Sequence, residues 1–387
     1  MGNYNFDEII PRRETGSAKW GYFDEDVLPL WVADMDFRLP QEIIDALKTR
    51  AEHGLFGYEF GSETLKTTIV ERLSRLYNWT ITPEDIMLLP GVIPGLSMAV
   101  KAFSKAGNKA LIQTPVYFPF YNVTTEQGVG HNLAPLTLND NDGLLHYTID
   151  EAAFEAKIDF KTDIFILCNP HNPVGRVWTR DELTAMADAC LKHDTLIISD
   201  EIHSDLIFDD YAHIPIASLS PEVSAKTITL MATSKSFNMP GLGAAYAIIT
   251  DAGLREKFSA ALWSIGAHAY TMGLVGTLAA YQHGDAWLKE ALTYMQANRD
   301  FTADFLRKEL PQVKFTCPEG TYLMWLDFRA LNIEKIGDFL LEKARVSLND
   351  GAWFGEDGVG FARINLACPR STLEQALLRI RDAVQAL

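Results

Sequence analysis

Short apolar runs alternate with helix-like segments over most of the chain, and this alternation constrains the fold more than any other feature. Helical periodicity is clearest at 41–53, 64–77, 95–104 and 180–193. Apolar runs typical of buried strands fall at 86–89, 109–112, 163–168, 195–199 and 227–231. Strands that alternate with helices pair into a largely parallel sheet covered by helices on both faces. We therefore predict an α/β fold with a mainly parallel central sheet.

The two ends of the chain differ from this middle part. Residues 1–39 show little periodicity but carry an apolar patch at 30–37, which indicates an extended arm lying on the rest of the protein. After Asp251 a long helical stretch, to about residue 310, precedes strand-like runs and shorter helical segments, at 322–328, 336–343, 361–366 and from 372 onward. We predict three parts: an arm that contributes to a small domain, a large domain, and a small α+β domain, at 1–40, 41–280 and 281–387.

The composition limits the classes of function. The chain has 387 residues, of which 48% are hydrophobic and 22% charged, so it has ample apolar material for a large core. Its formal net charge of -17 argues against nucleic acids and anionic membranes as partners, because phosphate binding needs clustered Lys and Arg. No apolar run is long enough to span a bilayer, and the amino terminus lacks the features of a signal peptide. Four scattered cysteines without C-x-x-C spacing complete the expectation of a cytoplasmic protein with reduced thiols.

Polar side chains follow three successive apolar runs at the points where the predicted strands end. The run 163–168 leads to Asn172, the run 195–199 leads directly to Asp200, and the run 227–231 leads to Lys235. Ligands bind at the carboxyl ends of strands in parallel α/β sheets, so we expect these three side chains to converge.

An amide, a carboxylate and an amine together match the needs of pyridoxal phosphate, whose ring accepts electrons only while its nitrogen is protonated. Asp200 would hold that proton, and Asn172 would donate to the phenolic oxygen of the ring. Lys235 would bind the aldehyde, because a partly desolvated lysine keeps a free amine. A lysine after a strand is as readily a solvated surface residue, so this assignment depends on its companions.

The cofactor phosphate needs donors of its own. Gly91, Val92 and Ile93 lie where an apolar run turns into a helix, and backbone N–H groups at a helix amino terminus bind anions. Thr233 and Ser234 could add hydroxyl donors. We predict these five residues as phosphate ligands.

Two further side chains complete the predicted site. Tyr117 lies where a strand ends and a helix begins, and we expect it to stack on the ring and take part in catalysis, although an ordinary core aromatic fits equally well. Arg363 lies on an apolar strand, where an arginine needs a partner; a substrate carboxylate and an internal salt bridge both satisfy that need. The cluster 200–205 could instead hold a metal ion, but no further His or Cys stands at ligand spacing, so we predict no metal site.

As a set, these residues resemble a known family. Asn-Pro-x-Asn-Pro-x-Gly at 169–175, Asp-Glu-Ile at 200–202 and Ser-Lys-x-Phe at 234–237 are similar to the motifs of fold-type-I pyridoxal-phosphate enzymes of the aminotransferase superfamily. The resemblance covers essentially the whole chain and implies a PLP-dependent transferase-like fold. Within that superfamily, several segments look like the MalY/PatB-type cystathionine β-lyases, which are carbon-sulfur lyases: 31–37, 56–58, 200–205, 234–238 and 368–370.

The resemblance implies roles beyond those worked out from the residues. It implies a homodimer in which Tyr58 reaches the neighbour's cofactor phosphate, and it makes Arg363 the ligand of the substrate α-carboxylate, with Asn172 and Asp34 beside it. His203 stands where a tyrosine commonly contacts the phenolic oxygen, which fits the lyase subgroup and makes it a cofactor ligand. The general pattern is broken at the phosphate by Gly243, in place of an arginine, and by Ala232, in place of a serine.

The reaction that these inferences predict is α,β-elimination from an L-cysteine S-conjugate such as cystathionine, with Lys235 as the base. The products are pyruvate, ammonia and a thiol. An aminotransferase would use the same residues with a second keto acid, and a pyridoxal-phosphate-bearing regulatory binding protein is a third reading. The preferred thioether stays open.

Overall fold

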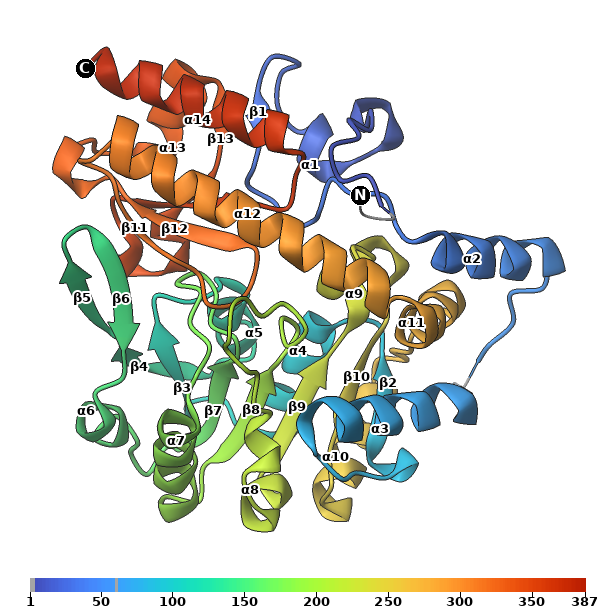
Figure 1. The fold of residues 1–387 in the computed structure, drawn as a ribbon. Coiled ribbons are helices and arrows are strands. Elements are labelled where there is room, and N and C mark those ends of the chain that lie inside the picture. Colours follow the sequence, from blue (N-terminus) through green and yellow to red (C-terminus); the bar gives the residue numbers. More distant parts are fainter. Residues whose placement is uncertain (1–3, 60–61) are drawn as a thin grey trace.

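A seven-stranded sheet forms the centre of the computed structural model, which describes residues 4–59 and 62–387 (Figure 1). The strand order is β2-β10-β9-β8-β7-β3-β4, with bounds Ile86–Leu89, Ala245–Ile248, Thr227–Met231, Leu196–Asp200, Thr162–Cys168, Lys109–Thr114 and Gly130–Pro135. From β9 to β4 all neighbours are parallel, whereas β10 runs antiparallel to both of its neighbours. The predicted mainly parallel sheet is confirmed.

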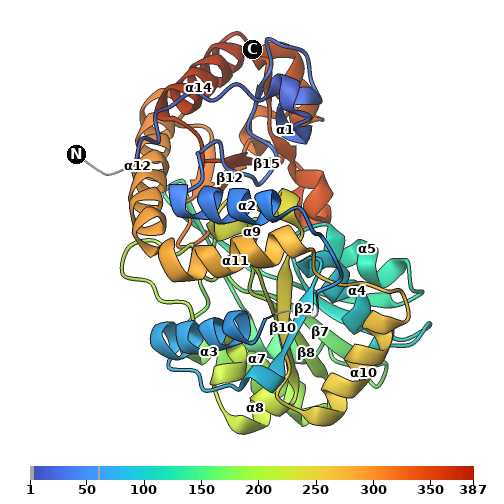
Figure 2. The ribbon, with the colours of Figure 1, turned by 90° about the vertical axis from the view of Figure 1, so that its right-hand side faces the viewer.

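Alternating side chains of the strands pack on helices from the two faces. Ile164 and Ile166 of β7 belong to a core with α4, α5 and α10, whereas Phe165 and Leu167 face α7 and α8. These helices span Val92–Phe103, Pro119–Thr125, Ala252–Trp263, Arg180–Lys192 and Pro221–Ala225. Figure 2 shows α2, α3 and α11 beside the β2 end of the sheet, at Gln41–His53, Glu63–Tyr77 and Thr271–His283. No helix among the described residues is long and apolar enough to cross a membrane.

A second sheet of six strands lies above the first in Figure 1. Its order is β14-β15-β12-β11-β6-β5, with bounds Asn349–Asp350, Phe361–Asn365, Leu323–Asp327, Lys314–Thr316, Leu144–Thr148 and Thr137–Asn141. Its helices are α12, α13 and α14, at Asp285–Glu309, Ile336–Phe339 and Arg370–Gln385. The arm joins this part of the molecule, because β1 (Leu28–Pro29) pairs in parallel with β13 (Val346–Ser347). The division into an arm and two domains stays a prediction.

Short elements connect these parts. The remaining α-helices are α1, α6 and α9, at Ala18–Gly21, Glu151–Glu155 and Thr233–Ser236. The η segments are short 3-10 helices, except that η6 is a π-helix; they span Arg13–Thr15, Pro83–Asp85, Ile216–Ser218, Pro240–Leu242, Arg329–Leu331, Leu340–Ala344, Gly351–Phe354 and Glu356–Gly358. Helix α4 begins three residues earlier than the expected residue 95, because Pro94 lacks an N–H and is tolerated in a first turn. That earlier start places the first turn of α4 at the functional site.

Candidate active site

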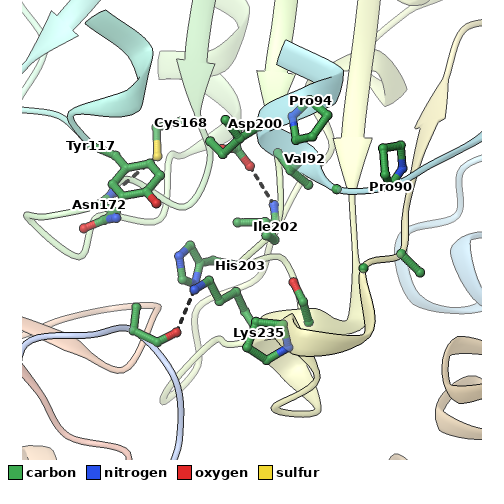
Figure 3. Close-up of a pocket in the computed structure, with 17 residues that line it drawn as sticks. Pro90, Val92, Pro94, Tyr117, Cys168, Asn172, Asp200, Ile202, His203 and Lys235 are labelled. Carbon is green, nitrogen blue, oxygen red and sulfur yellow. Dashed lines mark hydrogen bonds between the residues drawn. The ribbon is translucent and has the colours of Figure 1, made fainter. Parts of the chain in front are cut away.

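The parallel strands β7, β8 and β9 bring the three predicted residues together at one edge of the sheet. Cys168 pairs with Asp200, and Asp200 pairs with Leu230, so the three strands end at the same level. Asp200 is the last residue of β8, Asn172 follows β7, and Lys235 lies on α9 directly after β9. All three line one cavity of about 230 Å³ (Figure 3). The predicted convergence is therefore seen in the structure.

The cavity is lined by segments around the seven-stranded sheet and by Ala33 of the arm. Its wall contains most of the predicted site residues, namely Gly91, Val92, Ile93, Tyr117, Asn172, Asp200, His203, Ser234 and Lys235. It also contains residues that the sequence did not single out as ligands, among them Ala33, Pro94, Cys168, Ile202 and Ala244. A local sequence pattern carries no signal for these, because they reach the cavity through tertiary packing.

Lys235 presents a partly desolvated amine to the cavity. Its Nζ donates a hydrogen bond of 2.6 Å to the carbonyl of Ala33 on the arm. Burial is the main reason that the pKa of Lys235 falls to about 8, and the positive charge of Arg363 lowers it further, whereas Asp34 and Asp200 act in the opposite direction. A substantial fraction of this amine is therefore free just above neutral pH.

Asp200 is a buried carboxylate whose side chain lacks a cationic partner. Its Oδ1 accepts from the backbone N–H of Ile202 at 3.2 Å, and no ion pair to it is found in residues 4–59 and 62–387. Burial raises the pKa of Asp200 to about 7. A cation supplied by a ligand would stabilise the ionised form of this carboxylate.

Beside its apolar residues, the cavity wall contains Tyr117 and His203. Tyr117 lies beside Asn172 and Cys168 in Figure 3, and its backbone N–H donates to the carbonyl of Asn172 at 3.1 Å. His203 is buried with its ring edge against Tyr322, and its Nδ1 has no hydrogen-bond partner among the described residues. Burial lowers the pKa of His203 well below its ordinary value, so the ring is neutral.

The predicted phosphate end is built from the start of α4. Gly91 precedes the helix, and the first-turn N–H groups of a helix have no partner within it. Ser234 also lines the cavity, whereas the Thr233 hydroxyl lies outside the lining and shares a 3.0 Å hydrogen bond with Thr277. Their roles toward a phosphate stay predictions.

The structure explains why position 243 carries glycine. Gly243 has φ +62, and a Cβ built on it would lie 2.4 Å from a ring carbon of Tyr270. An arginine at this position would therefore require Tyr270 to move. Ala232 precedes α9 in an extended conformation and is buried.

Arg363 reaches the site from β15 and is held by neutral groups. Its Nη1 donates to Asn172 Oδ1 at 2.8 Å, while Nη2 donates to the carbonyl of Trp31 at 3.1 Å and to Asn349 Oδ1. The guanidinium lies over the ring of Phe354, and Nε has no partner in the described part of the chain. The internal salt bridge considered from the sequence is not seen, since no described carboxylate lies within 4.0 Å of it.

Asp34 and Tyr58, like Thr233 and Arg363, are not part of the cavity wall. Asp34 forms ion pairs with Arg12 and Lys19, at 2.7 and 3.5 Å. Tyr58 is 90% exposed and lies on a separate depression that also contains Trp263 and His268. The substrate role of Asp34 and the intersubunit role of Tyr58 stay predictions. Among the described residues, no group of three or more His, Cys, Asp or Glu could hold a metal ion.

Comparisons with known proteins agree with this geometry. The family model for aminotransferase class I and II matches residues 25–380. The chain belongs to the class I and II aminotransferase family. It is 41% identical to cystathionine beta-lyase PatB of Bacillus subtilis over 98% of this chain and 100% of that protein, and 33% identical to protein MalY of Escherichia coli over 99% and 100%.

A solved structure shows the same fold. Cystalysin from Treponema denticola, whose crystal structure contains a pyridoxal 5'-phosphate cofactor, superposes with a TM-score of 0.95 at 35% identity and 99% coverage of both chains. The expected PLP-dependent transferase-like fold and the resemblance to MalY/PatB-type lyases are thereby confirmed.

Proposed function

We propose that the protein is a pyridoxal-phosphate-dependent carbon-sulfur β-lyase, which cleaves L-cystathionine or related L-cysteine S-conjugates to pyruvate, ammonia and a thiol. The observation that carries this proposal is one cavity in which Lys235, Asp200 and Asn172 meet. Arg363, which has no carboxylate partner in the described part of the chain, donates to Asn172 beside it. The family membership and the full-length similarity to a cystathionine beta-lyase support it.

The residues of the cavity fit pyridoxal phosphate. Among the described residues, Asp200 has no ion-pair partner and His203 Nδ1 has no hydrogen-bond partner, so the carboxylate suits a protonated ring nitrogen and the imidazole suits a polar group of the ring. Tyr117 offers a ring face, and the first turn of α4 offers N–H groups for the phosphate. When bound, the cofactor supplies an aldehyde that captures amines and a protonated ring that accepts the electron pair released at Cα.

The protein's own residues supply binding and proton transfer. Arg363 binds the substrate α-carboxylate through its positive charge and the N–H groups that the described residues leave free, Nε–H among them, and Asn172 holds the guanidinium in place. The free amine of Lys235 removes the Cα proton, and its lowered pKa makes it available near neutral pH. Asp200 would hold a proton on the ring nitrogen of the cofactor through its negative charge. Cleavage of the Cβ–S bond then releases the thiol, and water converts the remaining enamine into pyruvate and ammonia.

An aminotransferase is the second candidate, because the matching family model carries that name and the same four residues would serve both reactions. The two reactions differ in their need for a second substrate. Purified holoenzyme with cystathionine should release pyruvate at an undiminished rate when no keto acid is added. Turnover that depends strictly on an added keto acid would assign the protein to the aminotransferases instead.

We also propose that two copies of the chain form a dimer through the surface around Tyr58. Exposed apolar side chains gather there beside a depression of about 710 Å³: Leu55, Phe56, Tyr58, Trp263, Ile265 and Tyr270. A patch of this kind marks an interface more often than free surface. Sedimentation of the purified protein should give the mass of a dimer, and a monomer at micromolar concentration would contradict the proposal.

A further inference from the structure

Residues 31–37 of the amino-terminal arm border the cavity, and two asparagine side chains donate hydrogen bonds to their backbone carbonyls. We call this segment the arm strap. Asn365 Nδ2 donates to the carbonyls of Val32 and Asp34, both at 2.7 Å. Asn238 Nδ2 donates to the carbonyls of residues 35 and 37, at 3.0 and 3.1 Å. Asn365 lies on the same strand as Arg363, and Asn238 follows Lys235 by three residues. The strap is therefore fixed by the two elements that carry the site.

The carbonyl of Ala33 is the point where the strap meets the amine. It accepts from Lys235 Nζ at 2.6 Å and from Tyr322 Oη at 2.8 Å (Figure 3 shows the first of these bonds). Asn365 donates hydrogen bonds to the carbonyls of the residues directly before and after Ala33, so the orientation of the intervening peptide is fixed. Burial raises the pKa of Tyr322 above its ordinary value, so its hydroxyl stays protonated and remains a donor.

This arrangement leaves the lone pair of the amine free. A neutral amine that donates an N–H to a carbonyl still has its lone pair available to take a proton. A hydroxyl that donated to the amine would block that lone pair, but Tyr322 is already engaged with the carbonyl of Ala33. Burial is the main cause of the lowered pKa of Lys235.

We propose that Asn365 and Tyr322 are positioning residues, which hold the Ala33 carbonyl as the acceptor for the Lys235 amine and keep its lone pair directed into the cavity. The inference rests on the proposed function only in giving Lys235 the role of base. The charged or titratable groups that face this amine are Arg363, Asp34, Asp200, His203 and Tyr322.

The test measures the Lys235 amine itself. The full-length apoenzyme is treated with limiting acetic anhydride across a pH series, and mass spectrometry follows acetylation of Lys235. The wild-type midpoint is expected near pH 8. Asn365→Ser should lower it by about one unit, because a released carbonyl no longer stabilises the ammonium, which raises the free-amine fraction at pH 8 from about one half to about nine tenths. Tyr322→Phe should give a smaller shift in the opposite direction, because the carbonyl then accepts from the ammonium alone and stabilises it more.

Asn298→Ser is the matched control. Asn298 is also fully buried, and its Nδ2 donates to two carbonyls, those of Leu366 and Cys368, both at 2.8 Å, without touching the strap. Its midpoint should equal the wild type. An unchanged midpoint in a folded Asn365→Ser protein, or an equal shift in Asn298→Ser, would overturn the proposal.

A second readout uses the holoenzyme. The acidic limb of its kcat profile should move to lower pH in Asn365→Ser and to higher pH in Tyr322→Phe, and an unmoved limb in both would count against the proposal. If Asn365→Ser does not fold, Tyr322→Phe decides the matter alone. Because the labelling needs no substrate, a failure of lyase activity leaves that result interpretable and would challenge the proposed reaction only.

Discussion

Replacing Arg363 by methionine should remove most of the activity while leaving the fold almost as stable. Arg363 is 4% exposed and is held by neutral acceptors, so its positive charge is left for a ligand. A carboxylate bound by two charge-assisted hydrogen bonds gains about 2 kcal/mol from each. The variant should therefore lose about 4 kcal/mol of substrate binding, or about 10³-fold in kcat/KM.

The stability of the ligand-free protein follows from two opposing effects. Burial lowers the pKa of Arg363 from 12.5 to about 10, which corresponds to roughly 3 kcal/mol of unfavourable free energy for the charged form. Methionine removes that cost, but it leaves three acceptors, on Asn172, Asn349 and Trp31, without their donor at about 1 kcal/mol each. The two effects cancel, so the melting temperature should change by only a few degrees.

The assay couples pyruvate release from cystathionine to NADH oxidation and is run beside thermal denaturation of the apoenzyme. Arg381→Met, a change on α14 away from the cavity, should keep the wild-type kcat/KM. A folded Arg363→Met enzyme that retains kcat/KM within tenfold of the wild type would refute the carboxylate assignment.

Three more changes have definite outcomes. Asp200→Asn should raise the apoenzyme melting temperature by several degrees at pH 8 but not at pH 4. The reason is that a carboxyl whose folded pKa is raised to about 7 destabilises the fold progressively as the pH rises from about 4 to 7. An equal rise at both pH values in calorimetry would contradict this. Trp263→Asp should shift sedimentation toward the monomer, since a charge would replace an apolar side chain that is 67% exposed, and an intact dimer would argue against this interface. Gly243→Ala should lower the melting temperature, because the new Cβ would meet the Tyr270 ring. Adding Tyr270→Ala should restore part of the lost melting temperature. If Gly243→Ala lowers the melting temperature equally with Tyr or Ala at position 270, the contact is disproved.

The local sequence pattern predicted the helices and strands well wherever the periodicity of a segment begins and ends with the helix or strand itself. The helix at 41–53 and the strand at 227–231 have the predicted bounds, because each begins and ends where its own periodicity does. Asn172, Asp200 and Lys235 could be foreseen as neighbours, since parallel strands share one carboxyl edge. Strand β10 was missed, because a short apolar segment before a helical stretch has no pattern that distinguishes it from the start of a helix.

Contacts between distant segments could not be predicted in the same way. The hydrogen bond from Lys235 to Ala33 joins residues that are 202 positions apart, and it depends on a backbone carbonyl that every residue possesses. Asn349 and Tyr322 likewise reach the site through the second sheet, whose pairing no local pattern specifies. The sequence pointed to the groups that we propose to carry the chemistry, whereas the groups that we propose to position them required the structure.

The stoichiometry of cystathionine cleavage tests the central claim most directly. Holoenzyme without any added keto acid is expected to release pyruvate and thiol in a 1:1 ratio, and Lys235→Ala, which lacks the amine that removes the Cα proton, is expected to release neither. Thiol or pyruvate formation that persists in Lys235→Ala, or cystathionine consumption by the wild type without pyruvate, would contradict the account.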